Sequence, residues 1–408
     1  MNILLINHYA GSKEHGMEYR PFYLAREWVC EGHHVTILAA SYSHVRTHNS
    51  SPEQAVTDEE IDGIRYIWLK TPSYHGNGLR RAINIFTFVS RFYAWQGRLF
   101  YGVPWNAVIA SSTYPLDIFP ARNLAQNVRA RLVFEVHDLW PLTLIELGGM
   151  SPLHPFIMLM QLAENYAYRH ADRVVSMLPK ADEYMREHGM AHDKFVYIPN
   201  GIDVLEWGKS TVSMPEEHQR ILTSLRQAGK YLIGYTGAHG LANGLDSLVE
   251  AAARITSEKV VFVFVGQGPQ KEALQRKVSQ YQLTNVVFLS PIPKASIPML
   301  LGSMDALYIG LKKGSLFRFG VSPNKLIDYM MAAKPVIYAI DAGNDPVAES
   351  GCGISIPPED PGAIIGAVTK LVNMVRSERE RMGSRGRDYV MANNDYRVLA
   401  RKFLEAIT

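Results

Sequence analysis

Residues 319–336 read F-G-V-S-P-N-K-L-I-D-Y-M-M-A-A-K-P-V. The pattern predicts a glycine-containing loop, then an amphipathic helix, then the start of an apolar strand, as expected of an α/β fold. Because Ser is favoured just before a helix and Pro at its first position, we expect Ser322 to cap the helix and Pro323 to begin it. A helix start offers unpaired N–H groups and the positive end of the helix dipole, which suit a phosphate.

Polar and charged residues around this helix start predict a nucleotide site. Four of them are assigned to a diphosphate: Arg318, Ser322, Asn324 and Lys325. Asp328 lies four residues after Asn324, so both side chains lie on the same side of the helix. We expect the Asp328 carboxylate to accept hydrogen bonds from ribose hydroxyls. The alternative is a solvated basic helix start that binds no ligand.

Composition bounds the class of protein. A chain of 408 residues is too long for one ordinary core, and two or three domains are expected. Hydrophobic residues at 47% and charged residues at 20% fit a soluble globular protein, and a net charge of +3 gives no reason to expect nucleic acid as a partner. Two cysteines suit a reducing compartment, so we expect a cytoplasmic protein. The apolar run at 3–6 is too short for a signal peptide, and no run approaches a transmembrane helix.

Strand-like and helix-like segments alternate along the chain, which predicts mostly parallel sheets. In the first half, strands are predicted at 2–7, 34–40, 64–69, 107–110, 131–135 and 173–176. In the second half, they are predicted at 231–235, 260–265, 286–289, 306–309, 335–339 and 353–356. Helices are predicted at 20–31, 245–255, 270–281, 323–333 and 396–407.

This order predicts an α/β protein with two Rossmann-like, doubly wound domains that face each other across a cleft. We expect the first domain at residues 1–200 and the second at 201–390. Residues 391–408 are expected to form a C-terminal helix, which could pack on either domain and which we place on the first. The polar segment 209–219 is the predicted linker. Ligands in such sheets bind at the carboxyl ends of the strands.

Several motifs recur in an order and spacing that are specific. They are P-N-G-I-D at 199–203, V-G-Q-G-P at 265–269, N-V-V-F-L at 285–289 and L-I-D-Y-M at 326–330 followed by K-P-V. Together they resemble the GT-B glycosyltransferases of the retaining family 4 over nearly the whole chain. The opening motifs, N-H-Y-A-G at 7–11 and G-M-E-Y-R-P at 16–21, resemble the subgroup that builds bacterial O-antigens and capsules. That subgroup includes N-acetyl-fucosamine transferases.

The resemblance implies a retaining glycosyltransferase with the GT-B fold. It would move a sugar, such as the N-acetylated amino sugar N-acetyl-fucosamine, from a UDP-sugar to a lipid-diphosphate-linked saccharide. The UDP-sugar is a co-substrate, and no cofactor is expected. The sequence has no Cys/His metal spacing and no Asp-x-Asp motif of the GT-A kind, so we expect no required metal.

The phosphate helix departs from the family pattern. The family has Glu-x7-Glu, whereas this chain has Gly320 at the first position and Asp328 at the second. We therefore expect backbone groups of Gly320 and Val321 to contact the donor sugar in place of the missing carboxylate. The family's Arg and Lys after the first strand of the second domain are also replaced, by G-A-H-G at 237–240 and N-G at 243–244. His239 in this loop is either a hydrogen-bond partner of a phosphate or a plain turn residue.

Three residues of the first domain are site candidates. Gly16 lies in a polar loop after the first strand, where backbone without a side chain can approach a phosphate, or simply form a turn. His137 and Asp138 follow the strand that ends at Glu135, and strand ends carry ligands in this architecture. The resemblance places such a His beside the donor sugar, and Asp138 is a candidate contact for the acceptor. The alternative for His137 is a packed or solvated loop histidine.

The segment 79–99 mixes basic and large apolar residues. Its arginines are Arg80, Arg81, Arg91 and Arg98. Such a helix can dock on an anionic membrane surface, although apolar residues at helical spacing are more often core. Apolar residues in 154–168 could extend this surface. We predict a peripheral protein at the inner face of the cytoplasmic membrane, where a lipid-linked acceptor would lie.

Other functions remain open. A UDP-N-acetylglucosamine 2-epimerase-like enzyme shares the GT-B architecture but would want further carboxylates in the cleft. A nicotinamide dehydrogenase would want a third glycine where Lys271 stands, and an acidic residue at the end of the next strand. A non-catalytic nucleotide-sugar-binding protein is possible because the first Glu of the family pattern is absent.

Overall fold

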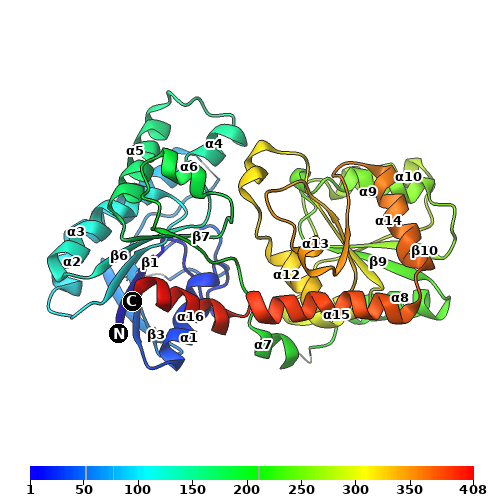
Figure 1. Cartoon of the computed structure of the whole chain (residues 1–408), viewed down its shortest axis with the longest axis horizontal. Coiled ribbons are helices and arrows are strands. Elements are labelled where there is room, and N and C mark those ends of the chain that lie inside the picture. Colours follow the sequence, from blue (N-terminus) through cyan, green and yellow to red (C-terminus); the bar gives the residue numbers. More distant parts are fainter. Residues whose placement is uncertain (51–52, 77, 210–211) are drawn as a thin grey trace. The chain divides into compact units, whose positions relative to one another are not determined.

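The computed structural model describes residues 1–50, 53–76, 78–209 and 212–408, which form two compact units (Figure 1). Unit 1 consists of Met1–Asn200 and Tyr396–Thr408, and unit 2 consists of Gly201–Asp395. Each unit has one sheet with helices around it. The alternation of strands and helices predicted from the sequence is therefore observed in both units.

The sheet of unit 1 has eight strands in the order β3-β4-β2-β1-β5-β6-β7-β8. All neighbours are parallel except β3 and β4, which form an antiparallel pair at one edge. The strands are β1 (Asn2–Ile6), β2 (His34–Ala40), β3 (Val56–Ile61), β4 (Ile64–Leu69), β5 (Ala107–Ala110), β6 (Arg131–Val136), β7 (Arg173–Ser176) and β8 (Phe195–Tyr197). The apolar pattern did not predict β3, because T-D-E-E at its centre is polar and the strand is partly exposed.

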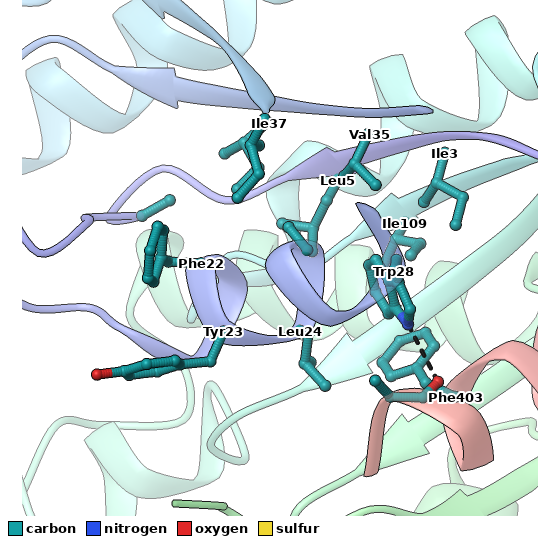
Figure 2. Close-up of a cluster of buried hydrophobic side chains, with 14 of the residues drawn as sticks. Ile3, Leu5, Phe22, Tyr23, Leu24, Trp28, Val35, Ile37, Ile109 and Phe403 are labelled. Carbon is teal, nitrogen blue, oxygen red and sulfur yellow. Dashed lines mark hydrogen bonds between the residues drawn. The ribbon is translucent and has the colours of Figure 1, made fainter. Parts of the chain in front are cut away.

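The helices of unit 1 include one from the end of the chain. They are α1 (Arg20–Cys30), α2 (Leu79–Phe100), α3 (Ile118–Val128), α4 (Leu142–Glu146), α5 (Pro155–His170), α6 (Asp182–Glu187) and α16 (Tyr396–Ile407), with a 3-10 turn at Pro115–Asp117. Figure 1 shows α16 beside α1. The core explains this pairing: Trp28 of α1 packs edge-on against Phe403 of α16 and donates from Nε1 to the carbonyl of Ala400 at 3.0 Å (Figure 2).

The sheet of unit 2 has six parallel strands in the order β11-β10-β9-β12-β13-β14. They are β9 (Tyr231–Thr236), β10 (Val260–Val265), β11 (Val286–Leu289), β12 (Ala306–Gly310), β13 (Val336–Ala339) and β14 (Gly353–Ser355). Most are buried along their whole length, as expected of a parallel sheet covered on both faces.

Helices cover both faces of this second sheet. They are α7 (Val204–Lys209), α8 (Glu216–Gln227), α9 (Leu245–Arg254), α10 (Lys271–Gln280), α11 (Ile297–Gly302), α12 (Asn324–Met331), α13 (Pro346–Ser350), α14 (Pro361–Asn373) and α15 (Arg376–Asn393), with 3-10 turns at Leu241–Asn243, Lys294–Ser296 and Ser315–Phe319. Leu232 of β9 packs in a cluster with α12, whereas Ile233 packs in a second cluster with α9 and α14. Successive side chains of β9 thus point to opposite faces of the sheet and pack into two separate cores. The sheet is covered by helices on both faces, as in a doubly wound domain.

The structure corrects one expectation. The predicted linker at 209–219 is wrong, because the two units divide between Asn200 and Gly201, and α8 begins at Glu216 and buries Leu222; residues 210–211 lie outside the described residues. Within the described part of the chain, no helix is long and apolar enough to cross a membrane.

Candidate functional site

Helix α12 begins with unpaired backbone donors. Pro323, with φ −75° and ψ 123°, is the N-cap, so the prediction that Ser322 caps the helix is wrong by one residue. In the described part of the chain, the amides of Asn324 and Lys325 have no acceptor, whereas the Leu326 amide donates to the carbonyl of Pro323 at 3.0 Å. Unpaired N–H groups at the positive end of the helix dipole form a site for an anion.

The ammonium group of Lys325 adds a full positive charge to this helix start. Nζ donates to the hydroxyl of Tyr235 at 2.8 Å and to Oδ1 of Asn243 at 3.4 Å. Gly237, with φ 127°, permits this approach, because a Cβ there would lie 2.8 Å from Cε of Lys325. Burial lowers the pKa of Lys325 to about 8. Lys325 therefore lies against the loop 237–244. This is the loop in which, by the resemblance described above, an Arg and a Lys would be expected and are absent.

His239 lies in the same loop but is fully buried. Burial lowers its pKa to about 4, so the ring is neutral. Neither ring nitrogen has a hydrogen-bond partner among the described residues. The ring is surrounded by aromatic side chains: Tyr235, Phe264 and Phe288. Because the ring is buried, a contact between His239 and a phosphate would require the loop to open. Lys325 could contact a phosphate at the start of α12 without such a movement.

Asp328 lies one turn into α12 and is partly buried. Burial raises its pKa to about 7, and the positive charge of Lys294 opposes this shift. Within the described residues, no side chain or backbone group donates a hydrogen bond to its carboxyl group. The ionised carboxylate is therefore able to accept hydrogen bonds from a ligand.

The segment before α12 is already paired through its amides. The Val321 amide donates to Oδ1 of Asn344 at 2.7 Å, and the Val321 carbonyl accepts from Nδ2 of Asn344 at 3.0 Å. The Gly320 amide donates to the carbonyl of Phe317 at 2.9 Å, with φ 100° in the left-handed region that glycine tolerates. A sugar contact from Gly320 or Val321 would therefore use carbonyl oxygens, which accept from hydroxyls.

Arg318 is exposed and is held on its own 3-10 turn. Nη1 donates to the carbonyl of Ser315 at 2.6 Å, and the guanidinium lies 4.2 Å from the ring centre of Phe319. A contact with a diphosphate remains a prediction for this residue.

In unit 1, His137 belongs to a buried hydrogen-bond network at the end of β6. The Glu135 carboxylate pairs with Nε of Arg20 at 2.9 Å and accepts from Oγ of Ser111 at 2.6 Å. Nε2 of His137 lies 2.9 Å from Oγ of Ser111 and 3.3 Å from Oε2 of Glu135. Burial alone would raise the pKa of Glu135, but Arg20 and His137 outweigh it and lower the pKa to about 2. The His137 ring is thus held from its Nε2 side.

Asp138 organises the turn that follows β6. Its Oδ1 accepts from the amide of Leu139 at 2.9 Å and from Oγ1 of Thr143 at 2.6 Å. Burial raises the pKa of Asp138, and these hydrogen bonds oppose the shift. The residue has a structural role in the turn, and its contact with an acceptor remains a prediction.

Gly16 is required by local packing. Its φ is 86°, and a Cβ there would lie 2.7 Å from Oγ1 of Thr47. Its amide donates to the carbonyl of Ser12 at 2.9 Å. Because this amide is used within the loop, the structure gives Gly16 a packing role, and its contact with a phosphate remains a prediction.

Helix α2 has two apolar faces. Ile85, Phe88, Phe92 and Phe100 are buried, whereas Leu79, Ile83, Phe86 and Tyr93 are exposed. Arg80 and Arg98 are exposed too. Arg81, in contrast, donates to the hydroxyl of Tyr9 at 3.1 Å, and its guanidinium lies 5.6 Å from the ring centre of Trp140. The exposed face therefore carries Arg80 and Arg98, while Arg81 is directed toward the loops after β1 and β6.

The structure thus brings predicted site residues together in unit 2. Lys325 and His239 both contact Tyr235, Asn243 accepts from Lys325, and Asp328 follows Lys325 on the same helix. In unit 1, sequence reasoning assigned no role to Glu135 or Ser111. The available signal was Glu135 itself, because a charged residue inside the otherwise apolar strand R-L-V-F-E-V indicates a buried, paired charge.

Comparison with protein families agrees with the division of the chain into two units. Residues 15–201 match the family described as glycosyl transferase 4-like domain. Residues 230–374 match the family described as glycosyl transferases group 1.

Two curated relatives are similar at the sequence level. The probable glycosyltransferase WbjE of Pseudomonas aeruginosa is 24% identical over 308 residues, which cover 74% of each chain. The putative colanic acid biosynthesis glycosyl transferase WcaI of Escherichia coli K12 is 22% identical over 398 residues, which cover 93% of each chain.

Solved structures share the fold. A sucrose-phosphate synthase from Thermosynechococcus elongatus has a TM-score of 0.69 at 18% identity and covers 99% of this chain and 97% of its own. HepE of Anabaena, solved in complex with UDP-glucose, has a TM-score of 0.66 at 15% identity and covers 99% of this chain and 98% of its own. The predicted GT-B fold with two Rossmann-like domains is confirmed.

Proposed function

Because the chain carries two glycosyltransferase family domains, one in each unit, we propose that it is a retaining glycosyltransferase that uses a UDP-sugar and requires no metal. The observation that carries this proposal is the start of α12. Two unpaired amides and the Lys325 ammonium lie together there, and Asp328 follows one turn later. The positive groups suit a diphosphate and the carboxylate suits ribose hydroxyls. That HepE of Anabaena was solved with UDP-glucose supports UDP as the nucleotide.

The chemistry that we propose is a front-face substitution. The bond between the anomeric carbon and the β-phosphate oxygen breaks, and the acceptor oxygen bonds to the same face of the sugar. The proton of the acceptor hydroxyl passes to the departing phosphate, so no enzyme nucleophile is needed. Lys325 and the free amides of α12 stabilise the charge that develops on UDP, which is the main electrostatic task of this reaction. His137 contacts the donor sugar and Asp138 the acceptor.

For the substrates, we propose an N-acetylated amino sugar such as N-acetyl-fucosamine and a lipid-diphosphate-linked saccharide. The motifs at 7–11 and 16–21 support the O-antigen and capsule subgroup. The name of WcaI, a putative colanic acid biosynthesis glycosyl transferase, also supports a role in surface polysaccharide synthesis.

We place the protein at the inner face of the cytoplasmic membrane, with α2 as the contact. Its exposed face carries Leu79, Ile83, Phe86 and Tyr93, and the helix has four arginines and no acidic residue. This pairing of apolar and cationic groups is complementary to an anionic lipid surface. A groove of about 620 Å³ on α5 is lined in part by the exposed side chains of Met158 and Leu162, which add apolar surface to unit 1.

The test uses the purified full chain. Thermal-shift screening against nucleotides and nucleotide sugars identifies the ligand, because a ligand that binds only the folded state raises Tm. Candidate UDP-sugars are then incubated with a lipid-diphosphate-linked saccharide, with and without EDTA, and UDP release and product anomer are measured. Retained configuration and unchanged turnover in EDTA are expected. Binding without turnover would indicate a nucleotide-sugar-binding protein, and conversion of the free UDP-sugar to its 2-epimer would indicate an epimerase.

A further inference from the structure

The proton positions around His137 follow from counting donors and acceptors. Glu135 is ionised at neutral pH, because the Arg20 guanidinium pairs with it at 2.9 Å and lowers its pKa, and an ionised carboxylate can only accept. Oγ of Ser111 lies 2.6 Å from Oε2 of Glu135, so the hydroxyl hydrogen of Ser111 points at the carboxylate. Oγ of Ser111 can therefore only accept any further hydrogen bond.

Asn7 and His137 both donate to Ser111. Nδ2 of Asn7 lies 3.2 Å from Oγ of Ser111, and Oδ1 of Asn7 accepts from the Tyr9 amide at 2.9 Å, which sets the orientation of the amide group. Nε2 of His137 lies 2.9 Å from the same Oγ. Because the Ser111 hydrogen is already used, this contact forms only when Nε2 carries a hydrogen. Oε2 of Glu135, at 3.3 Å, favours the same proton position.

A neutral imidazole with its hydrogen on Nε2 has a bare Nδ1. Nδ1 of His137 makes no hydrogen bond within the described part of the chain. It is therefore available to a ligand as an acceptor. An acceptor nitrogen suits a hydroxyl or an amide N–H and does not suit a phosphate oxygen.

We propose that Glu135 and Ser111 are positioning residues that hold the proton of His137 on Nε2 and so present Nδ1 to a hydroxyl or N–H group of the donor sugar. The ligand in this statement rests on the proposed function, whereas the proton position does not. Arg20 supports the arrangement, because its guanidinium pairs with Glu135 inside the fold.

The first test is the proton position in the wild-type protein. Long-range ¹H–¹⁵N NMR of labelled histidines reports which ring nitrogen carries hydrogen, and His137→Gln assigns the signal. At neutral pH the Nε2–H form of His137 is expected. A dominant Nδ1–H form, equal populations of the two tautomers, or a doubly protonated ring at neutral pH would overturn the proposal whether or not transfer is ever observed.

The second test removes the carboxylate. Glu135→Gln should yield a mixture of tautomers and lower kcat by roughly 10–100-fold, as loss of an orienting partner does elsewhere, with UDP affinity unchanged within about twofold. Since Glu135→Gln leaves Arg20 buried without its counter-ion, the double variant Arg20→Gln/Glu135→Gln is measured beside it, because it removes both charges.

A matched control is Glu164→Gln. Glu164 is also buried in unit 1, and it accepts from the hydroxyls of Tyr168 at 2.9 Å and Tyr184 at 3.0 Å. Its replacement should leave the His137 signal and kcat as in the wild type. If a folded variant lacking Glu135 keeps a single Nε2–H tautomer, Glu135 does not position His137. If the wild type shows the Nε2–H form but transfers no sugar, the proton network stands and the proposed function fails.

Discussion

Nζ of Lys325 lies 2.8 Å from the hydroxyl of Tyr235, a residue at the end of β9. This contact joins the start of α12 to the end of β9, and Asn243, in the segment that follows β9, accepts from Nζ as well. No carboxylate of the described chain pairs with Lys325, and burial lowers its pKa to about 8. A partly buried cation held by neutral groups is poised for an anionic ligand, which on our proposal is the diphosphate of UDP.

Replacing Lys325 with Ala should weaken UDP binding and slow transfer together, because the charge serves both the bound diphosphate and the leaving group. Loss of a charge-assisted hydrogen bond costs about 1.5–3 kcal/mol, which is roughly 10–150-fold in affinity. Calorimetry with UDP measures the first effect and turnover the second. Lys277→Ala is the control, because Lys277 pairs with Glu250 on the same unit. Wild-type affinity and rate in folded Lys325→Ala would remove Lys325 from the site.

UDP affinity should also depend on pH through Lys325. The ammonium is charged below about pH 8 in the free protein, and a bound diphosphate raises its pKa. Affinity is therefore fully present below pH 8 and falls as pH rises above it. Lys325→Met should bind more weakly and lose this alkaline decline. Titrations with UDP between pH 7 and 10 measure how affinity depends on pH in the wild type and in Lys325→Met. An equal decline in Lys325→Met would place the titrating group elsewhere.

Asp328→Asn should weaken UDP binding but stabilise the fold at alkaline pH. The folded pKa of Asp328, about 7, lies above its unfolded value, so the folded state holds the proton more tightly. The stability that this proton confers is present at low pH and is lost as pH rises through 7. Removing the carboxyl group should therefore raise Tm at pH 8 relative to the wild type, while UDP loses its ribose contact.

Asp388→Asn on α15 is the matched control, because Asp388 is exposed. It should change neither Tm at pH 8 nor UDP affinity. If Asp328→Asn binds UDP as well as the wild type does, Asp328 has no ribose contact, whatever its effect on Tm.

Sequence predicted the fold where strands are apolar throughout. The strands 107–110 and 260–265 have the predicted bounds, because all their residues are apolar and buried, which leaves no polar alternation to interpret. β3 was missed because it is an edge strand, and an edge strand needs few buried side chains. Its polar centre, T-D-E-E, is typical of a loop when only the sequence is considered. The α12 start was predicted one residue early because Ser322 and Pro323 both favour the first positions of a helix.

The site was predictable only where it is local. Lys325 and Asp328 lie on one helix, and their spacing can be read from the chain. Tyr235 is separated from Lys325 by 90 residues, and Ser111 from His137 by 26. Those contacts depend on which strands are neighbours in the sheet, and no spacing in the sequence specifies that order.

His137→Ala should keep UDP binding and lose most transfer. On our proposal, His137 contacts the donor sugar, and this contact would strengthen as positive charge develops at the anomeric carbon, so it would serve the transition state more than the bound substrate. UDP calorimetry and turnover separate the two effects. The control is His192→Ala, since His192 is an exposed histidine of the same unit. Normal turnover in His137→Ala would exclude a contact with the donor sugar.

The exposed face of α2 should bind anionic membranes in a salt-dependent way. Basic residues contribute about 1 kcal/mol each near an anionic surface, and salt screens this attraction. Arg80 and Arg98 are the residues to replace, because both are exposed, whereas Arg81 contacts Tyr9 and Trp140 inside unit 1. In flotation assays with anionic liposomes, the wild type should bind at low salt and dissociate at high salt. Arg80→Gln/Arg98→Gln should bind roughly 10–30-fold more weakly.

A control must separate the effect of the α2 position from the effect of net charge. Arg220→Gln/Arg381→Gln does so, because it removes the same charge from exposed sites in unit 2. This pair should bind liposomes as the wild type does. Phe86→Ser, which removes a side chain 43% exposed on the same face, should weaken binding at every salt concentration, because its contribution is apolar. UDP affinity should be unchanged in all three variants, since UDP is proposed to bind unit 2 at α12. Equal liposome binding by the two arginine pairs would show that only net charge matters, and α2 would then not be the membrane contact.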